Sequence, residues 1–123
     1  MTYAVNKFHI WKFHRYSILI SIVLLHFSCS EKIEVPISQT IMFEGKLYKT
    51  DAKDPFSGIV YNTYPNGQRE YAGEYKDGQP NGLLVYWYKN GNKMREGKLQ
   101  GGTPVGRWTT YKEDGSAQKT IDH

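Results

Sequence analysis

The chain has 123 residues, which leaves room for one domain, and its formal net charge is +4. Three of its 16 Lys and Arg residues lie in residues 1–28, which hold no acid, so 13 basic residues face 12 acidic ones in the remainder. That near-neutral remainder excludes the clustered positive surface that nucleic-acid binding requires. The single cysteine, Cys29, excludes an intramolecular disulfide.

The first 28 residues have the pattern of an export signal. Lys7, Lys12 and Arg15 form a basic segment, and residues 16–27 are an apolar run of 12 residues without Asp, Glu, Lys or Arg. Such a run suits the core of a signal peptide and is shorter than the ~20 residues that span a bilayer. We therefore expect residues 1–28 to be a helical signal segment.

Ser28, Cys29 and Ser30 directly follow this run, and the arrangement resembles the signal of a bacterial lipoprotein. The resemblance implies that the chain is cut before Cys29, that its sulfur is diacylated and that the new amine is acylated. His26 occupies the position where such signals usually have Leu. An ordinary cleaved secretory signal and an uncleaved, tilted membrane anchor are the alternatives, and all three export the chain.

Residues 29–40 are polar with one proline, and we expect them to be a tether to the membrane. Eleven residues reach less than ~40 Å when fully extended, at about 3.3–3.6 Å each. Ser30 is not the Asp that typically retains lipoproteins at the inner membrane. The predicted location is therefore the cell envelope, with the outer membrane favoured over the inner one.

A repeat of 24 residues organises the rest of the chain, residues 41–123. The predicted units are residues 58–81, 82–105 and 106–123, with a partial unit at residues 41–57. Asn-Gly pairs between strand-like runs favour hairpins with type I′ turns, whose two central residues need positive φ. Glycines at the repeated positions are predicted to be structural turn residues: Gly58, Gly67, Gly82, Gly91, Gly106 and Gly115.

Each unit is predicted to hold two strands, and the fold class is all-β, an antiparallel meander of stacked hairpins. The predicted forward strands are 59–64, 83–88 and 107–112, and the return strands are 68–76, 92–99 and 116–121. Residues 43–49 are expected to be one further return strand. Side chains two and five positions after the corner glycine, such as Leu84 and Trp87, have opposite parity. Either a bulge re-aims one set, or both faces of the strand are partly covered.

The repeat resembles the MORN-variant repeat, a short β-hairpin repeat of many bacterial proteins that is often described as antitoxin-like. The clearest copies run from Gly82 through Trp87 to Gly91 and from Gly106 through Trp108 to Gly115. The resemblance covers residues 43–123 and implies an elongated sheet of stacked hairpins. It implies little about activity, because a fold does not fix a function. A cytoplasmic antitoxin role fits an exported chain badly, whereas immunity against an exported toxin remains open.

Enzymatic chemistry has few residues to use, so we expect no catalytic site, no metal and no cofactor. The only histidine after Cys29 is His123, and zinc-binding clusters of Cys and His are absent from the sequence. A pair of carboxylates could still serve a hydrolase. The available acids, which a solvated surface explains better, are Glu70, Glu74, Asp77, Glu96, Glu113 and Asp114.

Aromatic residues are dense in the repeat, and they provide the candidate binding site. Most such residues fill the small core of a sheet, but some can face outward and anchor a partner. Tyr86 and Tyr88 share one parity and Trp87 has the other, so one set is expected to be exposed. The candidate stripe consists of Tyr64, Tyr86, Trp87, Tyr88, Trp108 and Tyr111.

The predicted function is a non-catalytic repeat module, tethered to the membrane through lipidated Cys29, that binds an unidentified protein of the envelope. An immunity role against a toxin is one form of this function. The first alternative is a lipoprotein that binds a glycan or the cell wall, because rows of Tyr and Trp also stack on sugar rings. The second is a hydrolase that uses surface carboxylates.

Overall fold

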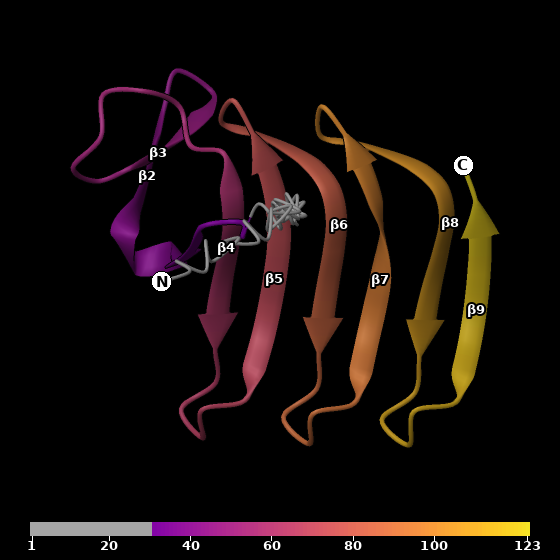
Figure 1. Cartoon of the computed structure of the whole chain (residues 1–123). Helices are drawn as coiled ribbons and strands as arrows, with labels where there is room; N and C mark the ends of the chain where they lie inside the picture. Colours follow the sequence, from indigo (N-terminus) through magenta and orange to yellow (C-terminus); the bar gives the residue numbers. More distant parts are fainter. Residues whose placement is uncertain (1–30) are drawn as a thin grey trace, which may run out of the picture.

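The computed structural model describes residues 31–123, and the signal segment with Cys29 lies outside these residues. A seven-stranded sheet has the order β1-β4-β5-β6-β7-β8-β9, and β2 and β3 form a separate hairpin beside it (Figure 1). The strands are β1 (Glu34–Pro36), β2 (Thr40–Phe43), β3 (Lys46–Lys49), β4 (Gly58–Thr63), β5 (Arg69–Lys76), β6 (Gln79–Trp87), β7 (Lys93–Gln100), β8 (Thr103–Tyr111) and β9 (Ala117–Asp122), and a short 3-10 helix spans Ile37–Gln39.

The predicted all-β meander is confirmed, since β4 to β9 pair antiparallel in chain order. The prediction of one strand over residues 43–49 is wrong. Glu44 and Gly45 both have positive φ, at 47° and 75°, and they turn the chain between β2 and β3. Two central residues with positive φ match a type I′ hairpin, so this segment folds on itself and does not extend the sheet.

The seventh strand comes from the predicted tether, which is the second correction. Glu34–Pro36 pairs parallel with β4, with Val35 opposite Val60. Val35 is only 4% exposed and packs in one cluster with Leu47, Phe56 and Val60. Burial of an apolar side chain contributes about 1.5–3 kcal/mol, which explains why this polar segment joins the domain at its one Val. Lys32 and Ile33 also contact the sheet, through Glu74 and through Ile59 N–H, so the predicted tether belongs to the domain from Lys32 onward.

The Asn-Gly and Asp-Gly turns lie at one end of the sheet, at the bottom of Figure 1, and they are not of type I′. In the first, Gly67 N–H donates to Tyr64 O and Tyr64 N–H to Gln68 O, which closes a three-residue loop. Only the glycine has positive φ, and Asn66 Oδ1 accepts from Gln68 N–H at 3.1 Å. A type I turn followed by a left-handed glycine has this form. The same hydrogen bonds recur in the turns around Asn90 and Asp114.

Type I′ geometry occurs at the opposite end of the sheet, between β5 and β6 and between β7 and β8. The central pairs are Asp77–Gly78 and Gly101–Gly102, and all four residues have positive φ. The prediction that Gly58, Gly82 and Gly106 are turn residues is therefore wrong, because these three lie within strands. Gly67, Gly91 and Gly115 do lie in turns.

Gly82 sits where the register between β5 and β6 shifts, and its φ is 117°. A Cβ at this position would overlap the side chain of Glu74. Glycine is needed here for two reasons, the left-handed backbone and the close approach of the carboxylate.

The register shifts at the turn end of each hairpin lie on the return strands, where Glu70, Met94 and Gln118 have no partner opposite. The side chains of the forward strands keep alternating between the two faces there, so Leu84 and Trp87 lie on opposite faces. No bulge re-aims either set, and both faces of the sheet are therefore partly covered. We call face A the side that carries Val60, Tyr86 and Trp108, and face B the side that carries Ile59, Val85 and Trp87. Within residues 31–123, no helix is long and apolar enough to cross a membrane.

Candidate functional site

An apolar cleft of about 300 Å³ lies on face B, across β4, β5, β6 and the start of β7. Val85 is buried at its floor, whereas Leu83 is 41% exposed. Ile59 and Ala72 line it beside them, and Trp87 lies at the end nearer the three-residue turns. We call this hollow the Trp87 cleft.

Charged side chains surround the Trp87 cleft, and they are held in ion pairs. Arg69 pairs with Glu34 of β1, and its guanidinium lies 4.6 Å from the centre of the Tyr61 ring. Lys93 pairs with Glu96 at 2.7 Å. The cleft therefore has an apolar floor and a charged rim, with positive and negative groups on both sides.

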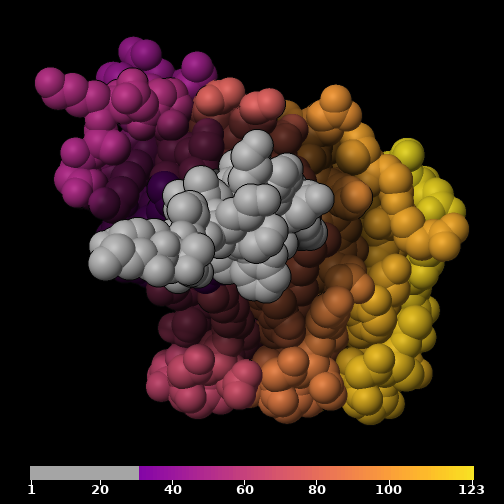
Figure 2. All heavy atoms as spheres, viewed as in Figure 1, coloured from indigo at the N-terminus to yellow at the C-terminus, as the bar shows by residue number. Residues whose placement is uncertain are grey.

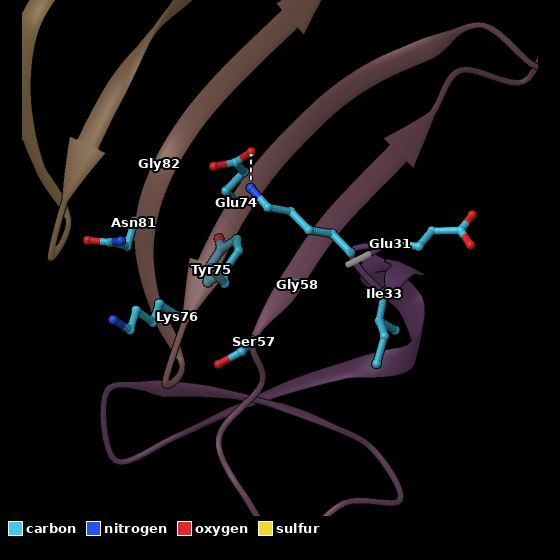
Figure 3. A pocket seen from close by; sticks show the side chains of 10 residues that line it. Glu31, Ile33, Ser57, Gly58, Glu74, Tyr75, Lys76, Asn81 and Gly82 are labelled. Carbon is cyan, nitrogen blue, oxygen red and sulfur yellow. Dashed lines mark hydrogen bonds and ion pairs between the residues drawn. The ribbon is translucent and has the colours of Figure 1, made fainter. Parts of the chain in front are cut away.

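A second cleft of about 430 Å³ adjoins the first at Glu74 and is open between residues 31–33 and the ends of β4, β5 and β6 (Figure 3). Tyr75, Lys76, Ser57 and Asn81 line it. It is more polar than the Trp87 cleft, and we call it the Glu74 cleft.

Glu74 connects residues 31–33 to the sheet through Lys32. Its carboxylate accepts from Lys32 Nζ at 2.7 Å and from Leu83 N–H at 3.1 Å. Partial burial acts to raise the pKa of Glu74, but these two hydrogen bonds and the charges of Lys32 and Lys98 outweigh it and lower the pKa below its usual value. Glu74 is therefore a structural anion between the two clefts.

The predicted aromatic stripe does not form one row. Trp87 lies on face B, and Tyr86 and Trp108 lie on face A. Trp108 is only 5% exposed: it lies over Gly97, under the guanidinium of Arg95, and it donates from Nε1 to Lys98 O. Trp108 belongs to the packing of the sheet and is not available as a surface anchor.

Tyr64 and Tyr88 join neighbouring repeat units. The Tyr64 hydroxyl donates to Trp87 O and the Tyr88 hydroxyl to Tyr111 O, each at 2.9 Å and each 23 residues further along the chain. Asn66 and Asn90 connect the same units: Asn66 Nδ2 donates to Lys89 O, and Asn90 Nδ2 donates to Glu113 O. The position equivalent to Tyr64 in the third unit is Lys112.

Tyr86 is 37% exposed and lies in a shallow depression of about 340 Å³ on face A. Its ring is 5.3 Å from that of Tyr71. Ile37, Asn62 and Glu70 also line the depression, and a 2.8 Å hydrogen bond joins Asn62 to Glu70. Burial raises the pKa of Tyr71 well above its usual range, and the hydrogen bond with Tyr75 acts in the same direction. We call this the Tyr86 depression.

Two of the acids available to the hydrolase hypothesis, Glu70 and Glu96, lie on opposite faces of the sheet. Glu70 faces the Tyr86 depression, and Glu96 lies on face B, where it accepts from Tyr111 at 2.6 Å and pairs with Lys93. These hydrogen bonds lower the pKa of Glu96, and the bond to Glu96 raises that of Tyr111. Within residues 31–123, no group of three or more His, Cys, Asp or Glu side chains could hold a metal ion.

The structure thus brings Trp87 together with residues that the aromatic stripe did not include, namely Ile59, Leu83 and Val85. A signal for two of them was present in the repeat. Ile59 and Leu83 are 24 residues apart and both apolar, whereas Arg107 occupies the same position in the third unit. The Trp87 cleft accordingly spans the first and second units only. No family model, no curated protein and no solved structure matches the chain.

Proposed function

We propose that the chain is a non-catalytic module, anchored in the cell envelope through lipid on Cys29, that binds a protein partner in the Trp87 cleft. The observation that carries this proposal is the apolar floor of Ile59, Leu83 and Val85 with a Trp at its end and a charged rim. An apolar centre with a polar rim is the usual anatomy of a protein interface, and Trp is enriched among its strongest contacts.

The partner that fits this cleft is a protein segment that presents one or two apolar side chains between charged residues. A volume of about 300 Å³ is at the lower end of small-molecule sites, so it accommodates side chains better than a whole cofactor. The ion pairs of Arg69 and Lys93 can exchange partners with charges on the bound segment. The MORN-variant resemblance and the export signal are compatible with an exported toxin as this partner.

Site-specific crosslinking in intact cells tests the proposal. A photoreactive residue in place of Leu83 should give a saturable crosslink to one protein, and Trp87→Ala should weaken capture of that protein more than tenfold. The matched control is Tyr86→Ala, which removes an exposed aromatic side chain from the opposite face. Capture that persists in Trp87→Ala, in protein with an unchanged thermal unfolding curve, would remove the site.

The Tyr86 depression supports a second candidate, the binding of a glycan or of the cell wall. It combines an exposed aromatic ring with Asn62 and Glu70, whose side chains can exchange hydrogen bonds with sugar hydroxyls. Peptidoglycan pelleting should then retain the protein and lose it in Tyr86→Ala, with Trp87→Ala as the control. Equal retention of both variants, or no retention of the wild type, argues against this candidate.

A further inference from the structure

Exposed large apolar side chains are concentrated in the part of the described chain that follows Cys29 most closely. Among residues 31–123, eight such side chains are exposed, and five of them fall within residues 33–43. They are Ile33, Ile37, Ile41, Met42 and Phe43. Ile41, Met42 and Phe43 are consecutive in β2, whereas Ile37 lines the Tyr86 depression. A contiguous apolar patch on a protein surface marks a contact with a membrane or with another protein.

Three of these residues, Ile41, Met42 and Phe43, form most of β2, and their exposed fractions are between 55% and 60%. The β2–β3 hairpin projects from the edge of the sheet beside β4 (Figures 1 and 2). Leu47 of β3 is buried in the domain core, so the hairpin is attached to the domain through this side chain. The remaining apolar surface of β2 has no cover among the described residues.

The outer side of the hairpin combines apolar and interfacial side chains. Ile41 lies opposite Tyr48, and Phe43 lies opposite Lys46, so these four residues share one face. The rings of Phe43 and Tyr48 meet edge to face, with centres 6.3 Å apart. Tyr and Lys place an apolar stem in lipid and a polar end at the headgroups, which makes this face suited to the boundary between them.

The chain connectivity holds this hairpin close to the predicted anchor. Cys29 precedes Ile33 by four residues, which span about 14 Å at most when extended. Ile33 O accepts from Ile59 N–H at the start of β4. Gly78 links the same end of the sheet to the hairpin, since Leu47 N–H donates to Gly78 O and Gly78 N–H to Phe56 O. The hairpin and Ile33 thus lie at the end opposite the three-residue turns.

We propose that the β2–β3 hairpin docks on the lipid bilayer that holds the acyl chains of Cys29, with Ile41 and Phe43 at the boundary between headgroups and acyl chains. This inference rests on the proposed lipid attachment. Docking orients the domain, because it places the hairpin at the membrane and the three-residue turns away from it. An acyl anchor at Cys29 alone would set the distance between the domain and the bilayer but not the orientation of the domain.

Spin-label accessibility measured on the full-length, lipidated protein tests this orientation. The protein is reconstituted into vesicles of phosphatidylethanolamine and phosphatidylglycerol, and Cys29 carries lipid, so an introduced cysteine is the only free thiol. A label on Phe43→Cys should collide several-fold more often with oxygen than with a water-soluble nickel chelate. A label on Glu113→Cys, in an exposed distal turn, should show the reverse. Adding Ile41→Ser should move the label at position 43 toward water.

Three outcomes would overturn the proposal, and they can be told apart. A label at position 43 that behaves like the label at position 113 shows that the hairpin lies in water. A label shielded from both reagents, with spin–spin broadening that grows with protein density, shows that a second copy covers the hairpin. An N-terminal peptide without acyl chains in the mass spectrum removes the anchor itself, whereas the first two outcomes leave the anchor intact.

Discussion

The indole of Trp108 lies directly over the backbone of Gly97 in the neighbouring strand, and its Nε1–H donates to Lys98 O at 3.1 Å. A Cβ on Gly97 would overlap the indole ring, so the missing side chain on β7 is what allows a Trp on β8. Gly73, at the equivalent position of the preceding unit, is covered first by the hydroxyl end of Tyr71 and then by Leu84 of the neighbouring strand. At both repeated positions the glycine leaves room for side chains that pack over the sheet.

We predict that Gly97→Ala lowers the free energy of unfolding by about 1–3 kcal/mol, the usual range for overpacking a close contact. Urea denaturation followed by tryptophan fluorescence measures the change. Because the clash is with the indole, Gly97→Ala combined with Trp108→Leu should cost less than the sum of the two single substitutions. Additive losses would show that the contact between the two residues is not the cause.

Removing one of the tyrosine hydroxyls that join neighbouring repeat units should lower the stability of the sheet. Tyr88→Phe deletes the hydrogen bond to Tyr111 O and is expected to lower the free energy of unfolding by about 0.5–1.5 kcal/mol. Tyr86→Phe is the control, because the Tyr86 hydroxyl makes no hydrogen bond within residues 31–123. Denaturation midpoints of the two variants that differ by less than the experimental error would contradict the structural role of Tyr88.

The parallel strand β1 gives a prediction about where the domain begins. Val35→Ala should destabilise the protein by about 1–3 kcal/mol, because it opens a cavity in the cluster with Val60 and Phe56. Ile33→Ala, two residues earlier and 66% exposed, should change the stability by less than about 0.5 kcal/mol. Equal stability of both variants would restore the tether hypothesis for residues 34–36.

Glu74 gives the domain a dependence on pH. Its pKa is lower in the folded protein than in the unfolded chain, so the ionised carboxylate stabilises the fold above its unfolded pKa. This contribution is lost as the pH falls from about 4.5 through the lower folded pKa. In Glu74→Gln, the loss of stability between pH 6 and pH 3 should be smaller than in the wild type. Lys32→Gln should have a similar but weaker effect, and profiles that coincide with the wild type would exclude Glu74 as a contributor.

The lipid attachment itself is tested by metabolic labelling with a radioactive fatty acid. Label should be incorporated into the wild-type protein and abolished in Cys29→Ala, because the thiol is the only one in the chain. Ser30→Ala, which leaves the thiol in place, should remain labelled. Label that persists in Cys29→Ala would assign the acyl chain to another residue.

Much of the sheet was predictable because its signals are local. Each Asn-Gly or Asp-Gly pair marks a reversal, and the 24-residue spacing repeats the same strands. The type of turn was not predictable from the dipeptide, since Asn66 can either adopt positive φ or accept a hydrogen bond from Gln68 N–H. Glu44–Gly45 was missed as a turn because Glu seldom adopts positive φ.

The candidate site was predictable only in part, because the sequence does not show which face of the sheet is covered and which is open. Trp87 was selected from the sequence as an aromatic residue, but the cleft floor of Leu83 and Val85 consists of ordinary strand residues. Trp108 was selected by the same rule and is buried. The sequence does not distinguish a buried aromatic residue on a strand from an exposed one. Burial of its ring depends on the side chains that the neighbouring strands place beside it.

The sequence by itself determined the repeat, the strands of the meander and the pattern of an export signal, since each depends on residues close together along the chain. Only the tertiary structure decided that Val35 packs in the core, that Trp87 and Trp108 lie on opposite faces, and that the apolar side chains of β2 are exposed. These outcomes depend on contacts between residues far apart in the sequence. Burial is a property of the assembled sheet, and no short segment of the chain encodes it alone.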